Sequence, residues 1–246
     1  IQMLYAIKGK IAVGYYSAVV RLINPLMMQI QAITVAMLPV LSRQFVGTGE
    51  KFRFTAEKTL KYVVAFGIPM AVGAFFLSER IILFLYGNEF RASIPPLQIL
   101  SWTLAISALT SVVSCSAVAS GRVFMLAAFN AVAALANVVL NLVLIPRFPQ
   151  HSPQGAAVAT LVCEVALLAA FVFAVWRSDV APLPWRDIGK IVLATAVMGG
   201  FVFLCRGASL FIVVPASVAI YSAVLLLLRF PAKEEKDLLR SALRRT

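Results

Sequence analysis

Long apolar stretches separated by short polar connections are the main pattern along this chain. Such stretches, bounded by charged residues, proline or glycine, lie at 15–40, 59–77, 94–118, 123–146, 155–176, 188–205 and 208–228. A helix needs about 20 apolar residues to cross the roughly 30 Å hydrocarbon core of a bilayer. The two-residue alternation of a membrane β-strand is absent from the sequence. The pattern therefore predicts an all-α fold, a polytopic membrane helix bundle of about seven transmembrane helices.

The connections predict how the chain is organised. We expect 1–14 to be the end of a preceding helix and an outer loop, since it shows no signal-peptide pattern and is too short to cross a membrane before the first long stretch. The other expected parts are five transmembrane helices over 15–176, a cytoplasmic loop over 177–187, two appended transmembrane helices over 188–228 and a basic cytoplasmic tail over 229–246. Segment 78–90 is mostly apolar but is interrupted by charged residues, and this pattern favours a short helix at the outer interface.

Composition supports a membrane protein over a soluble one. Hydrophobic residues make up 61% of the 246 residues and charged residues 13%, and the mean hydropathy is +0.93. Ordinary soluble domains carry about 25% charged residues. The net charge of +12 is spread between apolar runs rather than clustered, which argues against nucleic acid as a partner.

The distribution of basic residues predicts the topology. Most of the 22 Lys and Arg residues fall in alternate connections, together with the tail. Basic residues accumulate in cytoplasmic loops. We therefore expect a multi-pass membrane protein with its C-terminus in the cytoplasm.

Catalytic and metal-binding signals are missing from the sequence. The cysteines Cys115, Cys163 and Cys205 lie in three different apolar runs, and the single histidine, His151, is distant from all of them. This spacing supports neither a disulfide framework nor a metal site. No nucleophile with a base and no phosphate-binding loop is present. We predict a protein that is not an enzyme and that has no catalytic residues, bound metal or cofactor.

Polar residues inside the first span form one stripe. At about 100° per residue, one helix face carries Ser17, Arg21, Asn24, Met28 and Gln31. A charged side chain at the bilayer centre costs about 2.5 kcal/mol or more, so it should face a cavity or a partner. The stripe therefore predicts the wall of a water-filled passage, which Pro25 could help to open. The alternative is that Arg21 extends to the outer interface.

Two further spans carry candidate polar residues. Asn130, Asn137 and Asn141 share one face of the fourth span; they could bind sugar hydroxyls or join helices, and the sequence does not choose between these roles. Glu164 in the fifth span could be a proton or ion carrier, a partner of Arg21 or a neutral hydrogen-bonded acid.

Small residues mark two other spans. In the third span, hydroxyl side chains gather on one side, and we expect them to serve close helix packing rather than contact with a substrate, which is the alternative; they are Thr103, Ser107, Thr110, Ser111 and Ser114. In the second span, Gly67-Ile68-Pro69 and Gly73 are typical of a hinge.

Three motifs carry a resemblance to a known family. The first runs from Val13-Gly14-Tyr15-Tyr16-Ser17-Ala18 through Arg21-Leu22 to Met37-Leu38-Pro39-Val40-Leu41-Ser42-Arg43. The second runs from Ile81-Ile82 to Leu85-Tyr86-Gly87-Asn88-Glu89-Phe90. The third joins Asn137-Val138-Val139-Leu140-Asn141-Leu142-Val143-Leu144-Ile145-Pro146 to Gly155-Ala156-Ala157-Val158-Ala159-Thr160 and Glu164. In order and spacing they resemble the polysaccharide flippase branch of the multidrug/oligosaccharidyl-lipid/polysaccharide flippase superfamily.

This resemblance implies a fold and a function. The seven spans would be the C-terminal lobe and the two appended helices of a fourteen-helix transporter, whose N-terminal lobe lies outside this chain. The family turns over an undecaprenyl-pyrophosphate-linked oligosaccharide, an O-antigen or exopolysaccharide repeat unit, from the inner to the outer leaflet by alternating access. The implied partners are this lipid-linked substrate, membrane lipids, the N-terminal lobe, and a polysaccharide polymerase with its glycosyltransferases.

The resemblance also ranks the candidate residues. Arg21 matches a position that is often basic or polar in the family, where a cation would stabilise the pyrophosphate. Weaker cavity-lining candidates are Asn24, Gln31, Asn137, Asn141 and Glu164.

Other functions remain open at this point. A multidrug and toxin extrusion antiporter would need acidic residues in its cavity, and Glu164 is the one candidate. A lipid II flippase would carry out the same class of reaction on a different headgroup. A non-transporting scaffold would be expected to have large soluble loops, which the sequence lacks. The sequence does not identify a coupling ion, which could be a proton or sodium.

Overall fold

The structure is a computed structural model that describes residues 1–45, 49–149, 152–176, 185–205 and 207–230. Every regular element in these residues is a helix, and none of them is a strand. The elements are α1 (Gln2–Phe45), α2 (Gly49–Tyr86), η1 (Asn88–Ser93), α3 (Ile94–Ala119), α4 (Val123–Leu144), η2 (Ile145–Arg147), α5 (Gln154–Trp176), α6 (Trp185–Leu204) and α7 (Leu210–Leu227). Seven helices in the described residues are long and apolar enough to cross a membrane. The predicted all-α, multi-pass membrane fold is confirmed.

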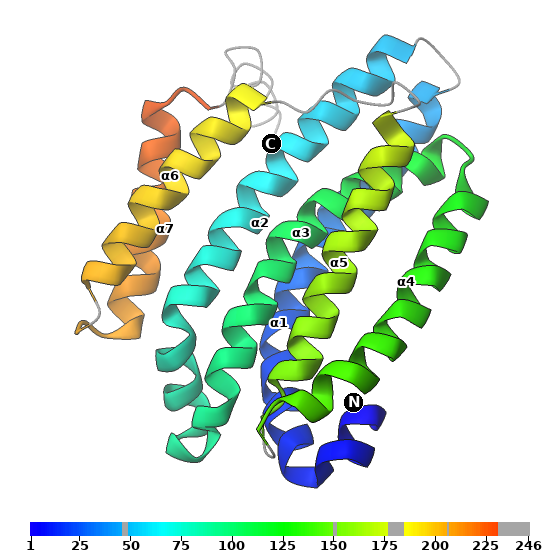
Figure 1. The fold of residues 1–246 in the computed structure, drawn as a ribbon. Coiled ribbons are helices and arrows are strands. Elements are labelled where there is room, and N and C mark those ends of the chain that lie inside the picture. The colour runs from blue at the N-terminus through cyan, green and yellow to red at the C-terminus, as the bar shows by residue number, and fades with distance from the viewer. Residues whose placement is uncertain (46–48, 150–151, 177–184, 206, 231–246) are drawn as a thin grey trace. The chain divides into compact units, whose positions relative to one another are not determined.

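The chain divides into two compact units, which are described separately. The first unit extends from Ile1 to Pro184 and contains α1 to α5, and the second extends from Trp185 to Thr246 and contains α6 and α7. In the first unit, successive long helices run in opposite directions, so that their connections alternate between the two ends (Figure 1). In the second unit, α6 and α7 pack against each other. The expected cytoplasmic loop and tail fall mostly on 177–184 and 231–246, outside the described residues.

The first helix has a sharp turn near its start. Gly9 has φ 78° and ψ −173°, and it joins the short helix Gln2–Lys8 to the long remainder of α1. Glycine takes this conformation at little cost because it has no Cβ. Leu4 packs with Ile145 in a buried cluster, and the Lys8 ammonium donates a hydrogen bond to the Phe148 carbonyl oxygen over 2.8 Å. The outer loop expected within 1–14 is therefore reduced to a turn, because these contacts hold the short helix against the connection between α4 and α5.

The expected interfacial helix over 78–90 is not a separate element. Residues 78–86 continue α2, and the chain turns at Gly87, with φ 78°, into η1. The Phe90 ring lies 5.5 Å from the Tyr15 ring and 5.2 Å from the Tyr86 ring. The Ser93 hydroxyl donates to the Tyr15 carbonyl oxygen over 3.1 Å. The sequence-based expectation was wrong here because residues 78–86 extend α2 despite their charged side chains, and the contacts of Phe90 and Ser93 with Tyr15 of α1 hold the turn that follows.

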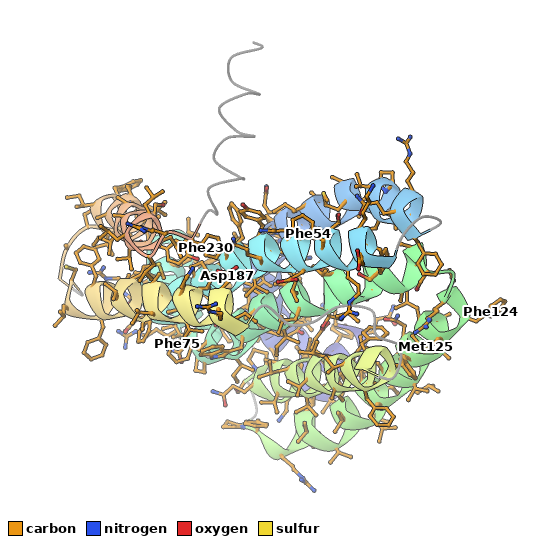
Figure 2. The ribbon with its side chains drawn as sticks, turned by 90° about the horizontal axis from the view of Figure 1, so that it is seen from above. Phe54, Phe75, Phe124, Met125, Asp187 and Phe230 are labelled. Atoms are coloured by element: carbon orange, nitrogen blue, oxygen red, sulfur yellow. The ribbon has the colours of Figure 1, made fainter. Side chains whose placement is uncertain are left out.

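Apolar side chains cover much of the outer surface. No residue of α4 is buried, and Phe124 at its start is 93% exposed and points away from the bundle (Figure 2). Such a surface would be unstable in water but matches the hydrocarbon of a bilayer. The exposed apolar residues thus identify surface that the bilayer or further protein covers.

Small residues allow the closest helix contacts. A Cβ atom on Gly67 would overlap the Ala108 side chain and lie 3.2 Å from the Leu104 carbonyl oxygen. A Cβ atom on Gly155 would lie 2.6 Å from the Leu144 carbonyl oxygen. Lipid is as apolar as leucine, so helices in membranes associate through such close packing. Gly67, which the sequence marked as part of a hinge, lies within the continuous helix α2 at its contact with α3.

We predict that Gly67→Ala destabilises the protein, because the added methyl group has no space between α2 and α3. Overpacking of this kind costs about 1–3 kcal/mol. The matched control is Gly73→Ala on the same helix, where an added Cβ meets nothing within 4 Å and should be neutral or stabilising by about 0.5–1 kcal/mol. Thermal unfolding of the two purified variants in detergent measures the difference. Equal unfolding temperatures would show that α2 and α3 do not approach as described.

Candidate functional site

A polar cleft lies within the first unit between four helices. Its volume is about 380 Å3. It is lined by Gln31, Thr34, Val35 and Leu38 of α1, by Ser107, Thr110, Ser111, Ser114, Cys115 and Val118 of α3, by Asn130 of α4, and by Glu164 and Leu167 of α5. Polar groups are costly within a membrane, so a cleft lined by hydroxyl, amide and carboxyl groups is a candidate functional site.

Helical periodicity brings these side chains together. Ser107, Ser111 and Ser114 are spaced so that they share one face of α3, and Gln31 and Leu38 share one face of α1. All of these residues lie in the halves of α1 and α3 that lead to the end of the bundle where α2 begins and α5 ends (Figure 1). The cleft is therefore formed by helix faces rather than by loops.

A contact between two hydroxyl groups and a hydrogen bond from a thiol to a carbonyl oxygen join α1 to α3 at the cleft. The Thr34 hydroxyl donates to the Ile30 carbonyl oxygen over 3.1 Å and lies 3.1 Å from the Ser111 hydroxyl. The Ser111 hydroxyl lies 3.0 Å from the Ala108 carbonyl oxygen. The Cys115 thiol donates to the Thr34 carbonyl oxygen over 3.4 Å. These bonds connect two walls of the cleft.

Glu164 contributes the acidic group of the cleft. Its carboxyl group forms a hydrogen bond with the Ser107 side chain, which connects α5 to α3. The structure therefore places Ser107, rather than Arg21, beside Glu164. Among the described residues, no group of three or more His, Cys, Asp or Glu side chains could hold a metal ion.

Arg21 and Asn24 lie outside the cleft, although they share a stripe of α1 with Gln31. Both side chains are exposed, and Met28 between them and Gln31 is 67% exposed. Arg21 forms no hydrogen bond or ion pair with any residue in the described part of the chain. With a rise of about 1.5 Å per residue, ten residues separate Arg21 from Gln31 by roughly 15 Å. The stripe thus leads along an unpacked helix face into the cleft.

The asparagine row of α4 is divided between two roles. The Asn141 side-chain amide donates to the Asn137 carbonyl oxygen and to the Asn137 side-chain oxygen, both over 2.8 Å. Neither of these two residues lines the cleft. Asn130 does line it, and its side-chain amide donates to the Leu126 carbonyl oxygen over 2.8 Å. The sequence row predicted a shared face, but only its first member reaches the cleft.

The hydroxyl residues of α3 are the main feature of the cleft that the sequence did not predict. We expected them to serve helix packing, and the structure places most of them on the cleft wall. Their spacing matches that of the α1 stripe, so in both spans the sequence shows polar residues along one helix face. The sequence could not show that these two faces lie opposite each other.

Comparisons with known proteins agree with this fold. The profile of the polysaccharide biosynthesis protein family matches residues 6–95. No curated protein matches the chain significantly. Among solved structures, the lipid II flippase MurJ in its inward closed conformation superimposes with a TM-score of 0.73 at 20% sequence identity. The match covers 93% of this chain and 48% of that one, so this chain spans about half the length of the solved flippase.

These matches support two statements at different levels. At 20% identity, the structural likeness shows the fold alone. The family match is a likeness in sequence, and it covers most of α1, all of α2 and η1. The family profile thus supports the predicted resemblance over residues 6–95, and the structural likeness shows that the chain shares the fold of the solved flippase.

Proposed function

We propose that this chain forms the C-terminal part of a flippase that moves an undecaprenyl-pyrophosphate-linked oligosaccharide, an O-antigen or exopolysaccharide repeat unit, across the bacterial inner membrane. The observation that carries this proposal is the polar cleft inside a bundle whose outer surface is apolar. A lipid-linked sugar has an apolar tail that can stay in the bilayer and a polar head that cannot. A polar cleft reached along a helix face supplies a place for such a head.

Arg21 supplies the charge that a pyrophosphate group needs. Its guanidinium group is exposed and unpaired within the described residues, so its donors remain available. Arginine binds phosphate through two parallel hydrogen bonds, and these are about twice as strong as neutral ones. In this proposal Asn24, Gln31 and Glu164 lie along the path of the head, while Asn137 and Asn141 hold the wall formed by α4.

Alternating access would require more protein than this chain contains. The solved flippase is about twice as long as the matched region, which supports an N-terminal lobe that faces the exposed stripe of α1. Membrane lipids would cover the apolar outer surface. A polysaccharide polymerase and glycosyltransferases are further proposed partners, since they would consume and supply the substrate. A proton or sodium ion could couple the movement.

A lipid II flippase is the second candidate function. The structural likeness to such a protein favours it, and the same cleft and Arg21 would serve a headgroup that also contains pyrophosphate and sugars. A multidrug and toxin extrusion antiporter has less support, because Glu164 is the one acidic residue among those that line the cleft.

We predict that Arg21→Ala abolishes transport while leaving the protein in the membrane. Each hydrogen bond to a charged group contributes about 1.5–3 kcal/mol, so its loss should weaken substrate binding by about 10- to 100-fold. Arg21→Lys should retain part of the activity because the charge remains. The measurement is restoration of surface polysaccharide in host cells that lack the gene for this chain.

The control for this experiment is Arg147→Ala. Arg147 is exposed in η2 and does not line the cleft, so this variant removes the same charge elsewhere and should restore polysaccharide normally. Full restoration by Arg21→Ala at equal membrane abundance would remove Arg21 from the mechanism. Altered drug sensitivity with normal surface polysaccharide in cells without the gene would favour the antiporter.

We also predict the orientation in the membrane. The end of the first unit that carries Arg43, Lys51, Arg53 and Arg122 should face the cytoplasm, because basic residues accumulate there. Alkaline phosphatase is active only outside the cytoplasm, so a fusion after Pro149 should be active and fusions after Gly121 and after Thr246 should be inactive. The opposite pattern of activities would contradict this topology.

A further inference from the structure

We propose that the cleft between α1, α3, α4 and α5 is a subsite for an uncharged, hydroxyl-rich sugar group, and that the pyrophosphate binds outside it. This inference rests on the proposed function and adds that the sugar and the pyrophosphate of one substrate bind at two different places on the same lobe. It is carried by the hydrogen-bonding state of the groups that line the cleft.

The hydroxyl protons at the contact of α1 and α3 are already engaged within the protein. A serine or threonine hydroxyl has one proton to donate and two lone pairs to accept with. Thr34 and Ser111 contact each other and the carbonyl oxygens of Ile30 and Ala108, so three acceptors share two protons. Both oxygens therefore offer lone pairs, rather than protons, to a ligand.

The same holds for other polar groups of the lining. The Thr110 hydroxyl donates to the Ile106 carbonyl oxygen over 3.0 Å. Asn130 uses one amide proton on the Leu126 carbonyl oxygen, which leaves its side-chain oxygen as an acceptor. The Glu164 carboxyl group brings further acceptor oxygens. The polar surface of the cleft is consequently rich in acceptors.

An acceptor-rich surface distinguishes sugars from phosphates. A sugar hydroxyl has a proton to donate, so it can bond to each of these oxygens. An ionised pyrophosphate has only acceptor oxygens and needs a cation or several donors. No lysine or arginine is among the residues that line the cleft, so a pyrophosphate there would have little to compensate for its lost hydration.

Gln31 and Ser114 supply the complementary donors. Neither side chain forms a hydrogen bond with another described residue, so both can donate to a ring or hydroxyl oxygen of a sugar. Val35, Leu38 and Leu167 complete the lining with apolar surface, against which the carbon atoms of a sugar ring can pack. Most small-ligand sites combine apolar walls with a few polar groups in this way.

Size and position support the same assignment. At about 380 Å3 the cleft is near the lower end of the roughly 300–1,000 Å3 range of small-molecule sites, which suits a sugar ring rather than an entire repeat unit. Arg21 lies roughly 15 Å from Gln31 along α1. A headgroup could thus place its sugar in the cleft and its pyrophosphate near Arg21.

The first test compares two lipids on the purified full-length protein in nanodiscs. The probes are undecaprenyl pyrophosphate and the same lipid carrying a repeat unit of several sugars, which is long enough to extend from Arg21 to the cleft, and native mass spectrometry measures the dissociation constant of each. We expect the sugar to strengthen binding by about tenfold. In the variants Glu164→Gln and Gln31→Ala this gain in affinity should fall severalfold. Arg21→Ala should instead weaken the binding of both lipids and leave the ratio of their dissociation constants unchanged. The matched control Val132→Ala, at an exposed position of α4 outside the cleft, should change neither.

The outcomes separate the two proposals. If neither lipid binds, or if Arg21→Ala changes neither affinity, the proposed function fails. If both lipids bind and depend on Arg21, but the cleft variants leave the gain from the sugar unchanged, the sugar subsite is wrong and the proposed function stands.

A second test does not depend on the lipid. In a variant with Cys115, Cys163 and Cys205 replaced by alanine, Ser114→Cys places a thiol on the cleft wall. N-acetylglucosamine should slow its reaction with a hydrophilic thiol reagent severalfold, and inorganic pyrophosphate should not. The control thiol, Arg147→Cys in the same background, should react equally with and without sugar. Protection of Ser114→Cys by pyrophosphate but not by the sugar would overturn the assignment.

Discussion

A polar group within a bilayer must find its hydrogen-bond partner inside the protein, and the rest of this structure depends on that constraint. It requires every crossing segment to be a helix, because only then are the backbone groups bonded within the segment. It also turns hydroxyl side chains toward the preceding turn, as Thr34 and Thr110 show. The hydroxyls of the cleft wall are thus stable in an apolar setting, yet their lone pairs remain available.

The same constraint keeps basic side chains out of the cleft. A cation enclosed among hydroxyl and amide groups would lose much of its hydration, and no lysine or arginine is among the residues that line the cleft. Arg21 instead lies on an exposed part of the α1 stripe. The lobe therefore presents two chemistries along one helix, a cationic position and an acceptor-rich cleft. A lipid-linked oligosaccharide has the matching pair, an anionic linker and hydroxyl-rich sugars.

Close packing by small residues makes this arrangement possible. Gly67 lets α2 approach α3, and Gly155 lets the start of α5 approach the end of α4. The hydrogen bonds among Thr34, Ser111 and Cys115 then connect α1 and α3. These contacts act together with the buried apolar residues of the bundle, such as Ile30, Val63 and Leu104, to hold the helices in place around the cleft.

The sequence by itself determined the class of fold and the number of crossing helices, because apolar length is a local property that needs no knowledge of neighbours. It also placed Arg21 and Gln31 on one stripe, since helical periodicity fixes which residues share a face. It failed at 78–86, which extends α2 despite its charged residues, and it assigned the α3 hydroxyls to packing. Only the tertiary structure decided that Ser107 and Ser111 lie opposite Gln31 and Glu164, and that Asn141 bonds to its own helix, because which helix faces meet depends on contacts between residues far apart in the chain.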